Sequence, residues 1–119
     1  MSLKLIRKKN QELIVETGVI ASDYFSRLKG LMGKKSYSFG EGMLFPKCNS
    51  IHMWGMKISI DVVFLKKENA DWKIEALHSS LQPWKILPVT CLQAQDTLEL
   101  PEGTIKRLGL ERGEVLCTV

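Results

Sequence analysis

The sequence lacks any run of about 18 consecutive apolar residues, the length that a helix needs to cross a membrane, so we expect no membrane partner. Cysteines are few: Cys48, Cys91 and Cys117 lie far apart, and no C-x-x-C pair is present. An odd number of widely spaced cysteines does not form a disulfide framework, and the lack of a C-x-x-C pair gives no support to a zinc knuckle or a redox motif. We therefore expect reduced thiols and a cytoplasmic location. The alternative is a natural N-terminus that carried an export signal, since removed.

Phosphate-binding loops are also lacking. The nine glycines never form the G-x-G-x-x-G or P-loop spacing, so we expect no nucleotide cofactor and no cofactor of another kind. The excess of positive charge is small, with 17 Lys and Arg against 13 Asp and Glu. Basic residues form only short groups, such as those within residues 4–9 and 66–67, and no aromatic residues are interleaved with them to stack on bases. This pattern favours a solvated surface and no nucleic-acid partner.

No internal repeat, low-complexity tract or flexible linker divides the 119 residues, so we expect a single domain over residues 1–119. Short apolar or alternating runs predict strands over residues 3–6, 13–15, 43–45, 51–56, 58–65, 72–76, 94–100 and 114–119. Two short helices are predicted over about residues 22–30 and 103–108, the second ended by Gly109. The elements together predict a mainly β member of the α+β class, with a small antiparallel or mixed sheet that is open or closed as a barrel.

Residues 58–65 carry the clearest strand pattern. Ile58, Ile60, Val62 and Phe64 alternate with the other side chains, so we expect these four to face the core. The opposite face includes a charged residue and is expected to be mixed in character.

Several short motifs follow one another in an order that is typical of a known family. The clearest are CNSIHMWGM at residues 48–56 and IDVVFL at residues 60–65; the others are GLMG at residues 30–33, GMLFP at 42–46, PWK at 83–85 and LELPEG at 98–103. From about residue 25 to about residue 116, the chain resembles the domain of unknown function 192 family, also called uncharacterised protein family 0127. The resemblance implies a β-rich fold and no established activity.

The same motifs contain the residues that we expect to bind a ligand. On an extended strand, His52, Trp54 and Met56 share one face, and Trp84 lies in a loop bounded by two prolines. Small-molecule pockets combine such apolar walls with a few polar groups, and sugars stack on tryptophan. We therefore predict a small-molecule-binding module, with a carbohydrate as one candidate ligand and no oligomeric state specified. Its expected site residues are Cys48, His52, Trp54, Met56, Asp61 and Trp84, with His52 at the mouth of a cleft whose other wall carries Trp84.

Two other functions stay open, and the sequence does not decide whether the protein is an enzyme. Cys48, His52 and Met56 are spaced four apart and are soft-metal ligands, but neighbours in this set lie roughly 13 Å apart on an extended strand. A small hydrolase would use Cys48, His52 and Asp61, provided that a bulge brings the last two to one face. The structural alternative is that His52 serves the fold, Trp54 and Met56 lie in the core, and Asp61 anchors a backbone turn or pairs with a nearby base.

Overall fold

The structure, a computed structural model, describes residues 2–21, 36–53, 56–85 and 87–119. The helix expected over residues 22–30 and the candidate site residue Trp54 lie outside this part of the chain. Within it there is one helix, α2 (Thr104–Leu108), which confirms the second expected helix. No helix among the described residues is long and apolar enough to cross a membrane.

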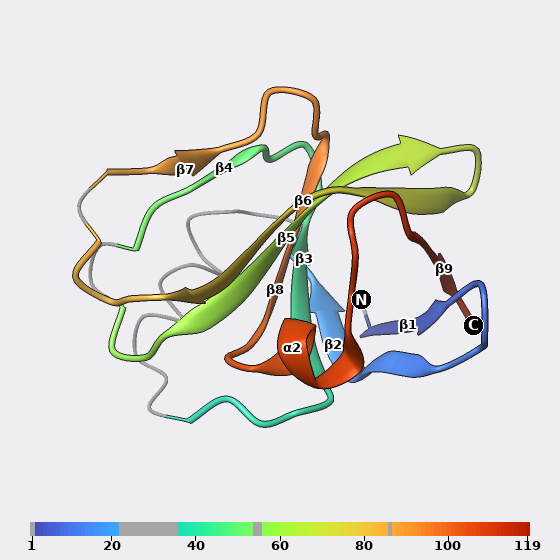
Figure 1. Ribbon diagram of the computed structural model, residues 1–119, viewed down its shortest axis with the longest axis horizontal. Coiled ribbons are helices and arrows are strands. Elements are labelled where there is room, and N and C mark those ends of the chain that lie inside the picture. The colour runs from blue at the N-terminus through green and yellow to red at the C-terminus, as the bar shows by residue number, and fades with distance from the viewer. Residues whose placement is uncertain (1, 22–35, 54–55, 86) are drawn as a thin grey trace.

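Seven strands close into a barrel (Figure 1). This confirms the mainly β prediction and shows that the sheet is closed rather than open. Around the barrel the order is β1 (Ser2–Arg7), β2 (Leu13–Ile20), β3 (Glu41–Phe45), β8 (Asp96–Pro101), β5 (Ile60–Glu68), β6 (Asp71–Leu81) and β9 (Val115–Thr118). The sheet is mixed, since β2 and β3 pair in parallel and the other barrel neighbours pair antiparallel. Because β9 pairs with β1, the two ends of the chain lie side by side (Figure 1).

A two-stranded sheet lies outside the barrel wall (Figure 1). It pairs β4 (Ser50–Ile51) with β7 (Val89–Thr90). Ile51 and Val89 of this sheet pack with Val62 and Phe64 of the barrel in one hydrophobic cluster, which we call the outer cluster. A second cluster, the barrel cluster, fills the interior with residues that include Leu5, Leu44 and Leu98. The chain therefore builds two apolar layers that share one wall.

Strand β5 is that shared wall. Val63 and Leu65 belong to the barrel cluster and are fully buried. The four residues that the sequence predicted to face the core belong to the outer cluster. Ile60, Val62 and Phe64 are fully buried in it, and Ile58 is partly buried against it. The face expected to be mixed is also buried, because the strand lies between two packed layers rather than between a core and solvent.

The strand predicted over residues 51–56 is wrong. Strand β4 ends at Ile51, His52 and Met53 lie outside any strand, and the N–H of Met56 donates to the carbonyl of Met53 at 3.1 Å. Both methionines are buried in the outer cluster, where flexible thioether side chains fill apolar space well. The period-two argument that placed His52 and Met56 on one face of a strand therefore does not apply.

A buried ionic network joins β1 to the C-terminal part of the chain. The Arg7 side chain is 5% exposed and forms ion pairs with Glu114 and, at 2.7 Å, with Glu12. It also donates to the backbone carbonyls of Leu108 and Gly109 at the end of α2. One guanidinium thus ties together the β1–β2 hairpin, the helix and the turn before β9.

Candidate functional site

Cys48 lies half-buried between β3 and β4, where three hydrogen bonds fix its position. Its N–H donates to the carbonyl of Gln95 at 3.0 Å, its carbonyl accepts the Thr97 hydroxyl at 2.6 Å, and its thiol donates to the Ser50 carbonyl at 3.2 Å. Burial raises the pKa of the Cys48 thiol above its ordinary value. A thiol that stays protonated is a poor nucleophile, so this geometry gives no support to Cys48 as the attacking group of a hydrolase.

Asp61 is fully buried, and both of its carboxylate oxygens accept backbone N–H groups. Oδ1 accepts from Ser80 and Oδ2 accepts from Ile105, each at 2.9 Å. Ser80 lies where the pairing of β5 with β6 shifts register, between the Ile60 and Val62 positions, and its φ is 54°. The carboxylate therefore stabilises this irregularity in β6 and the start of α2. The contacts support the structural alternative for Asp61 rather than a role as a catalytic base.

Replacing Asp61 with Asn should lower the free energy of unfolding by about 1–3 kcal/mol. The amide accepts hydrogen bonds only at its oxygen, so one of the two N–H groups loses its partner. Urea unfolding of the two proteins measures the difference. Asp71→Asn is the matched control, because the Asp71 carboxylate pairs with the largely exposed Lys8 ammonium, and its loss should cost far less than the loss of the Asp61 carboxylate. Equal costs for the two variants would contradict the anchoring role.

His52 and Met56 do not form a shared surface with Asp61 in the way that the sequence suggested. His52 is half-buried between Ile51 and Met53, each 1% exposed, and Met56 is a core residue of the outer cluster. In the part of the chain that the structure describes, no three His, Cys, Asp or Glu side chains gather as they would need to hold a metal ion. These contacts give no support to a soft-metal site.

Trp84 lies in a different place, on the wall of a groove. Its side chain is 74% exposed, and that of Leu87 is 72% exposed. The groove has a volume of about 740 Å³, and the described residues that line it come from the end of β6, the loop that follows and β7: His78, Ser80, Leu81, Gln82, Trp84, Lys85, Leu87, Pro88, Val89 and Thr90. Neither Cys48 nor His52 is among these lining residues, and the histidine that accompanies Trp84 is His78.

Hydrogen bonds hold the polar groups of the groove in place. The Gln82 side chain accepts the Ser59 hydroxyl at 3.1 Å and donates to the Ser80 carbonyl at 2.8 Å. The N–H of Lys85 donates to the Gln82 carbonyl at 3.1 Å, which closes the turn that carries Trp84. A ligand would therefore meet a surface that is largely preformed, and preformed sites lose less entropy on binding.

His78 is a groove residue that the sequence analysis missed. Its ring packs edge-on against Phe64, with the ring centroids 5.6 Å apart. Burial and the nearby charge of Lys85 lower the pKa of His78, so its imidazole is neutral at pH 7 and offers one donor and one acceptor. The feature that could have identified His78 is its position on the return strand of the hairpin, where it pairs with the core residue Val62.

Glu99, on β8, is a second group that the sequence did not single out. Its neighbours Leu98 and Leu100 belong to the barrel cluster, so alternation points the Glu99 side chain toward the outer cluster. The residue is 1% exposed, and one of its carboxyl oxygens has no hydrogen-bond partner among the described residues. Burial raises the pKa of Glu99 to about 8, so the carboxyl group is largely protonated at neutral pH.

The fold places this chain among small closed β-barrels with mixed strand pairing. It belongs to the DUF192 family, because the model of that family, described as Uncharacterized ACR, COG1430, matches residues 5–117. The match confirms the resemblance that the ordered motifs indicated.

Two solved structures are similar to nearly the whole chain. One is a protein from Sinorhizobium meliloti 1021, provisionally described as a transcription regulator, with 25% sequence identity, a TM-score of 0.80 and coverage of 98% of this chain and 92% of that one. The other is a protein of unknown function from Novosphingobium aromaticivorans DSM 12444, with 19% identity, a TM-score of 0.78 and coverage of 98% and 83%. The second likeness shows the fold alone. No curated protein matches the sequence.

Proposed function

We propose that this DUF192 protein binds a small carbohydrate in the groove beside Trp84. The observation that carries the proposal is the exposure of Trp84, a residue that is 74% exposed, whereas Trp72 is only 6% exposed. Large aromatic rings contribute strongly to folding when they are buried, so an exposed ring beside a groove indicates a binding surface. The apolar C–H face of a sugar ring is suited to stacking on an indole.

The other groups of the groove support a neutral, hydroxyl-rich ligand. The neutral His78 imidazole and the Ser80 and Thr90 residues provide donors and acceptors for hydroxyl groups. Among the described lining residues, Lys85 carries the sole formal charge at pH 7. Leu87 adds an apolar contact next to Trp84, which matches the alternating polar and apolar surface of a sugar.

The provisional description of the Sinorhizobium meliloti structure suggests nucleic acid as another partner. The basic residues of the present chain do not favour it, since they form only short groups along the sequence, with acidic residues among them and a net charge of only +4. Binding to duplex DNA depends on many free cations that release counterions from phosphates. We therefore favour the carbohydrate over a nucleic acid.

Isothermal titration calorimetry with a panel of soluble oligosaccharides tests the proposal on the wild type, Trp84→Ala and Leu92→Ala. Leu92 is the matched control, because it is 81% exposed but does not line the groove. We expect the wild type to bind at least one member of the panel, Trp84→Ala to bind it about tenfold more weakly or worse, and Leu92→Ala to change affinity by less than about twofold. Equal weakening in both variants, or no binding of the whole panel by the wild type, would overturn the proposal.

A further inference from the structure

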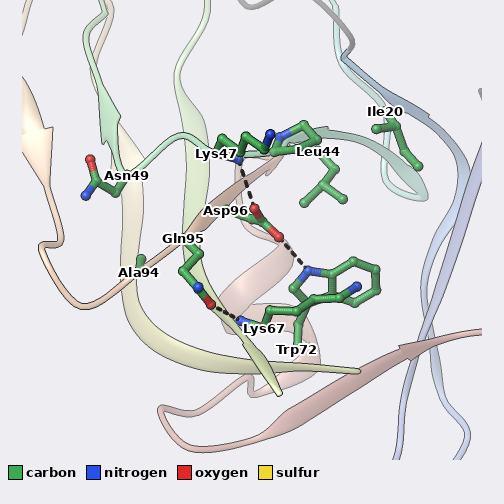
Figure 2. A pocket seen from close by; sticks show the side chains of 10 residues that line it. Ile20, Leu44, Lys47, Asn49, Lys67, Trp72, Ala94, Gln95 and Asp96 are labelled. Atoms are coloured by element: carbon green, nitrogen blue, oxygen red, sulfur yellow. Dashed lines mark hydrogen bonds between the residues drawn. The ribbon is translucent and has the colours of Figure 1, made fainter. Parts of the chain in front are cut away.

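A second cavity, of about 620 Å³, opens at one end of the barrel (Figure 2). None of its described lining residues belongs to the Trp84 groove. Its apolar lining includes Ile20 at the end of β2, Leu44 on β3 and Trp72 at the start of β6. The volume falls within the range of cavities that hold small organic ligands.

Hydrogen bonds fix the polar lining of this barrel-end cavity, as the dashed lines in Figure 2 show. Asp96 Oδ1 accepts the N–H of Lys47 at 3.0 Å, and Oδ2 accepts the indole N–H of Trp72 at 2.8 Å. Gln95 Oε1 accepts the N–H of Lys67 at 2.9 Å. Both oxygens of the Asp96 carboxylate are thus occupied by donors of the protein itself, which holds the tryptophan and the Lys47 turn in position.

Two lysine side chains add positive charge to this cavity. Lys47 and Lys67 are exposed, and the Lys67 ammonium lies 3.8 Å from the centroid of the Trp72 ring. No carboxylate among the described residues forms an ion pair with either ammonium. The cavity therefore combines an apolar wall with two cations, against a single carboxylate that is already hydrogen-bonded on both oxygens.

We infer that the barrel-end cavity binds a small organic acid, an apolar body that carries one carboxylate. The body packs against Trp72, Leu44 and Ile20, and the carboxylate lies between the Lys47 and Lys67 ammonium groups, where charge-assisted hydrogen bonds form. A neutral apolar ligand leaves the two cations without an anionic partner, and an inorganic anion leaves the apolar wall in contact with water. The inference uses no residue of the Trp84 groove and does not depend on the carbohydrate proposal.

Nuclear magnetic resonance tests the inference through the indole N–H signal of Trp72. The probes are phenylacetate, 4-phenylbutyrate and octanoate at millimolar concentration, with 4-phenylbutanol as the neutral counterpart of the second acid. The variants are Lys67→Gln, Lys67→Arg and Lys66→Gln. Lys66 is the matched control, since it is the exposed neighbour of Lys67 in β5, does not line the cavity, and its replacement changes the net charge by the same amount.

We expect at least one acid to shift the Trp72 signal saturably and 4-phenylbutanol to bind about fivefold more weakly or worse. Lys67→Gln should weaken binding of the acid by about fivefold or more, whereas Lys67→Arg and Lys66→Gln should change it by less than about twofold. Equal affinity for the acid and the alcohol, equal losses in Lys66→Gln and Lys67→Gln, or no shift with any of the three acids would overturn the inference.

Discussion

Replacing Arg7 with Met should lower the free energy of unfolding by about 3–5 kcal/mol at pH 7. The guanidinium forms ion pairs with Glu114 and Glu12 and donates to two backbone carbonyls near the end of α2. Its removal leaves the Glu114 carboxylate, whose side chain is 6% exposed, without its cationic partner. Breaking a buried ion pair by removing one member costs far more than the pair itself contributes, because an uncompensated charge stays buried.

Urea unfolding followed by circular dichroism measures this effect. Lys8→Met is the control, since the Lys8 side chain is 61% exposed in its ion pair with Asp71 and its loss should cost far less than the loss of Arg7. Burial alone would raise the pKa of Glu114, but the hydrogen bonds from Arg7 and from the Glu111 N–H lower it below its ordinary value. The contribution of the pair should therefore be complete above the ordinary pKa of Glu and fade as the pH falls through the lower folded value. An Arg7→Met variant as stable as Lys8→Met would refute the network.

We expect Glu99 to make the stability of the wild type depend on pH between about pH 4.5 and 8, and Glu99→Gln should remove that contribution. Because the folded pKa is raised from 4.5 to about 8, the unfolded chain releases this proton at a lower pH than the folded protein does. The stability of the wild type is therefore highest below the unfolded pKa and falls as the pH rises, by about 1.4 kcal/mol per unit for this group within the window. The neutral amide of the variant does not titrate. The free energy of unfolding of Glu99→Gln minus that of the wild type should therefore be roughly 4 kcal/mol larger at pH 8 than at pH 4.5.

The measurement is the free energy of unfolding at several pH values for the wild type, Glu99→Gln and Glu102→Gln. Glu102 lies in the same motif but is exposed, so its replacement should leave the shape of the profile unchanged. Profiles that run parallel for the wild type and Glu99→Gln would show that Glu99 ionises in the folded protein as it does in the unfolded chain.

Most of the barrel could be predicted from the sequence because its strands bury a regular pattern of side chains. The β1–β2 and β5–β6 hairpins are local, and the alternation of Ile60, Val62 and Phe64 correctly marked a buried face. The parallel pairing of β2 with β3 depends on contacts between separate segments, and hydrophobic periodicity within a segment does not predict such contacts. The same is true of β7, whose two residues are held by pairing with β4.

The candidate site was predicted less well, for a physical reason that concerns the segment after β4. His52 and Met56 fit the alternating pattern of a strand, but β4 ends at Ile51 and both Met53 and Met56 are buried in the outer cluster. The prolines of its loop drew attention to Trp84, which lines the groove, whereas the groove residue His78 lies on β6 beyond the return strand predicted over residues 72–76. The burial of Glu99 was not predicted, because that face of β8 is buried only by the packing of the outer cluster against it.

The most direct test of carbohydrate binding is the response of the tryptophan indole N–H signals in a ¹H–¹⁵N spectrum during titration with the oligosaccharide panel. The signal of Trp84 is assigned by its loss in Trp84→Phe. We predict that a binding sugar moves the Trp84 signal saturably and leaves that of Trp72 in place, because the Trp72 N–H donates to Asp96 in the barrel-end cavity. A panel that leaves the Trp84 signal unmoved, or that moves the Trp72 signal alone, would contradict the proposed function.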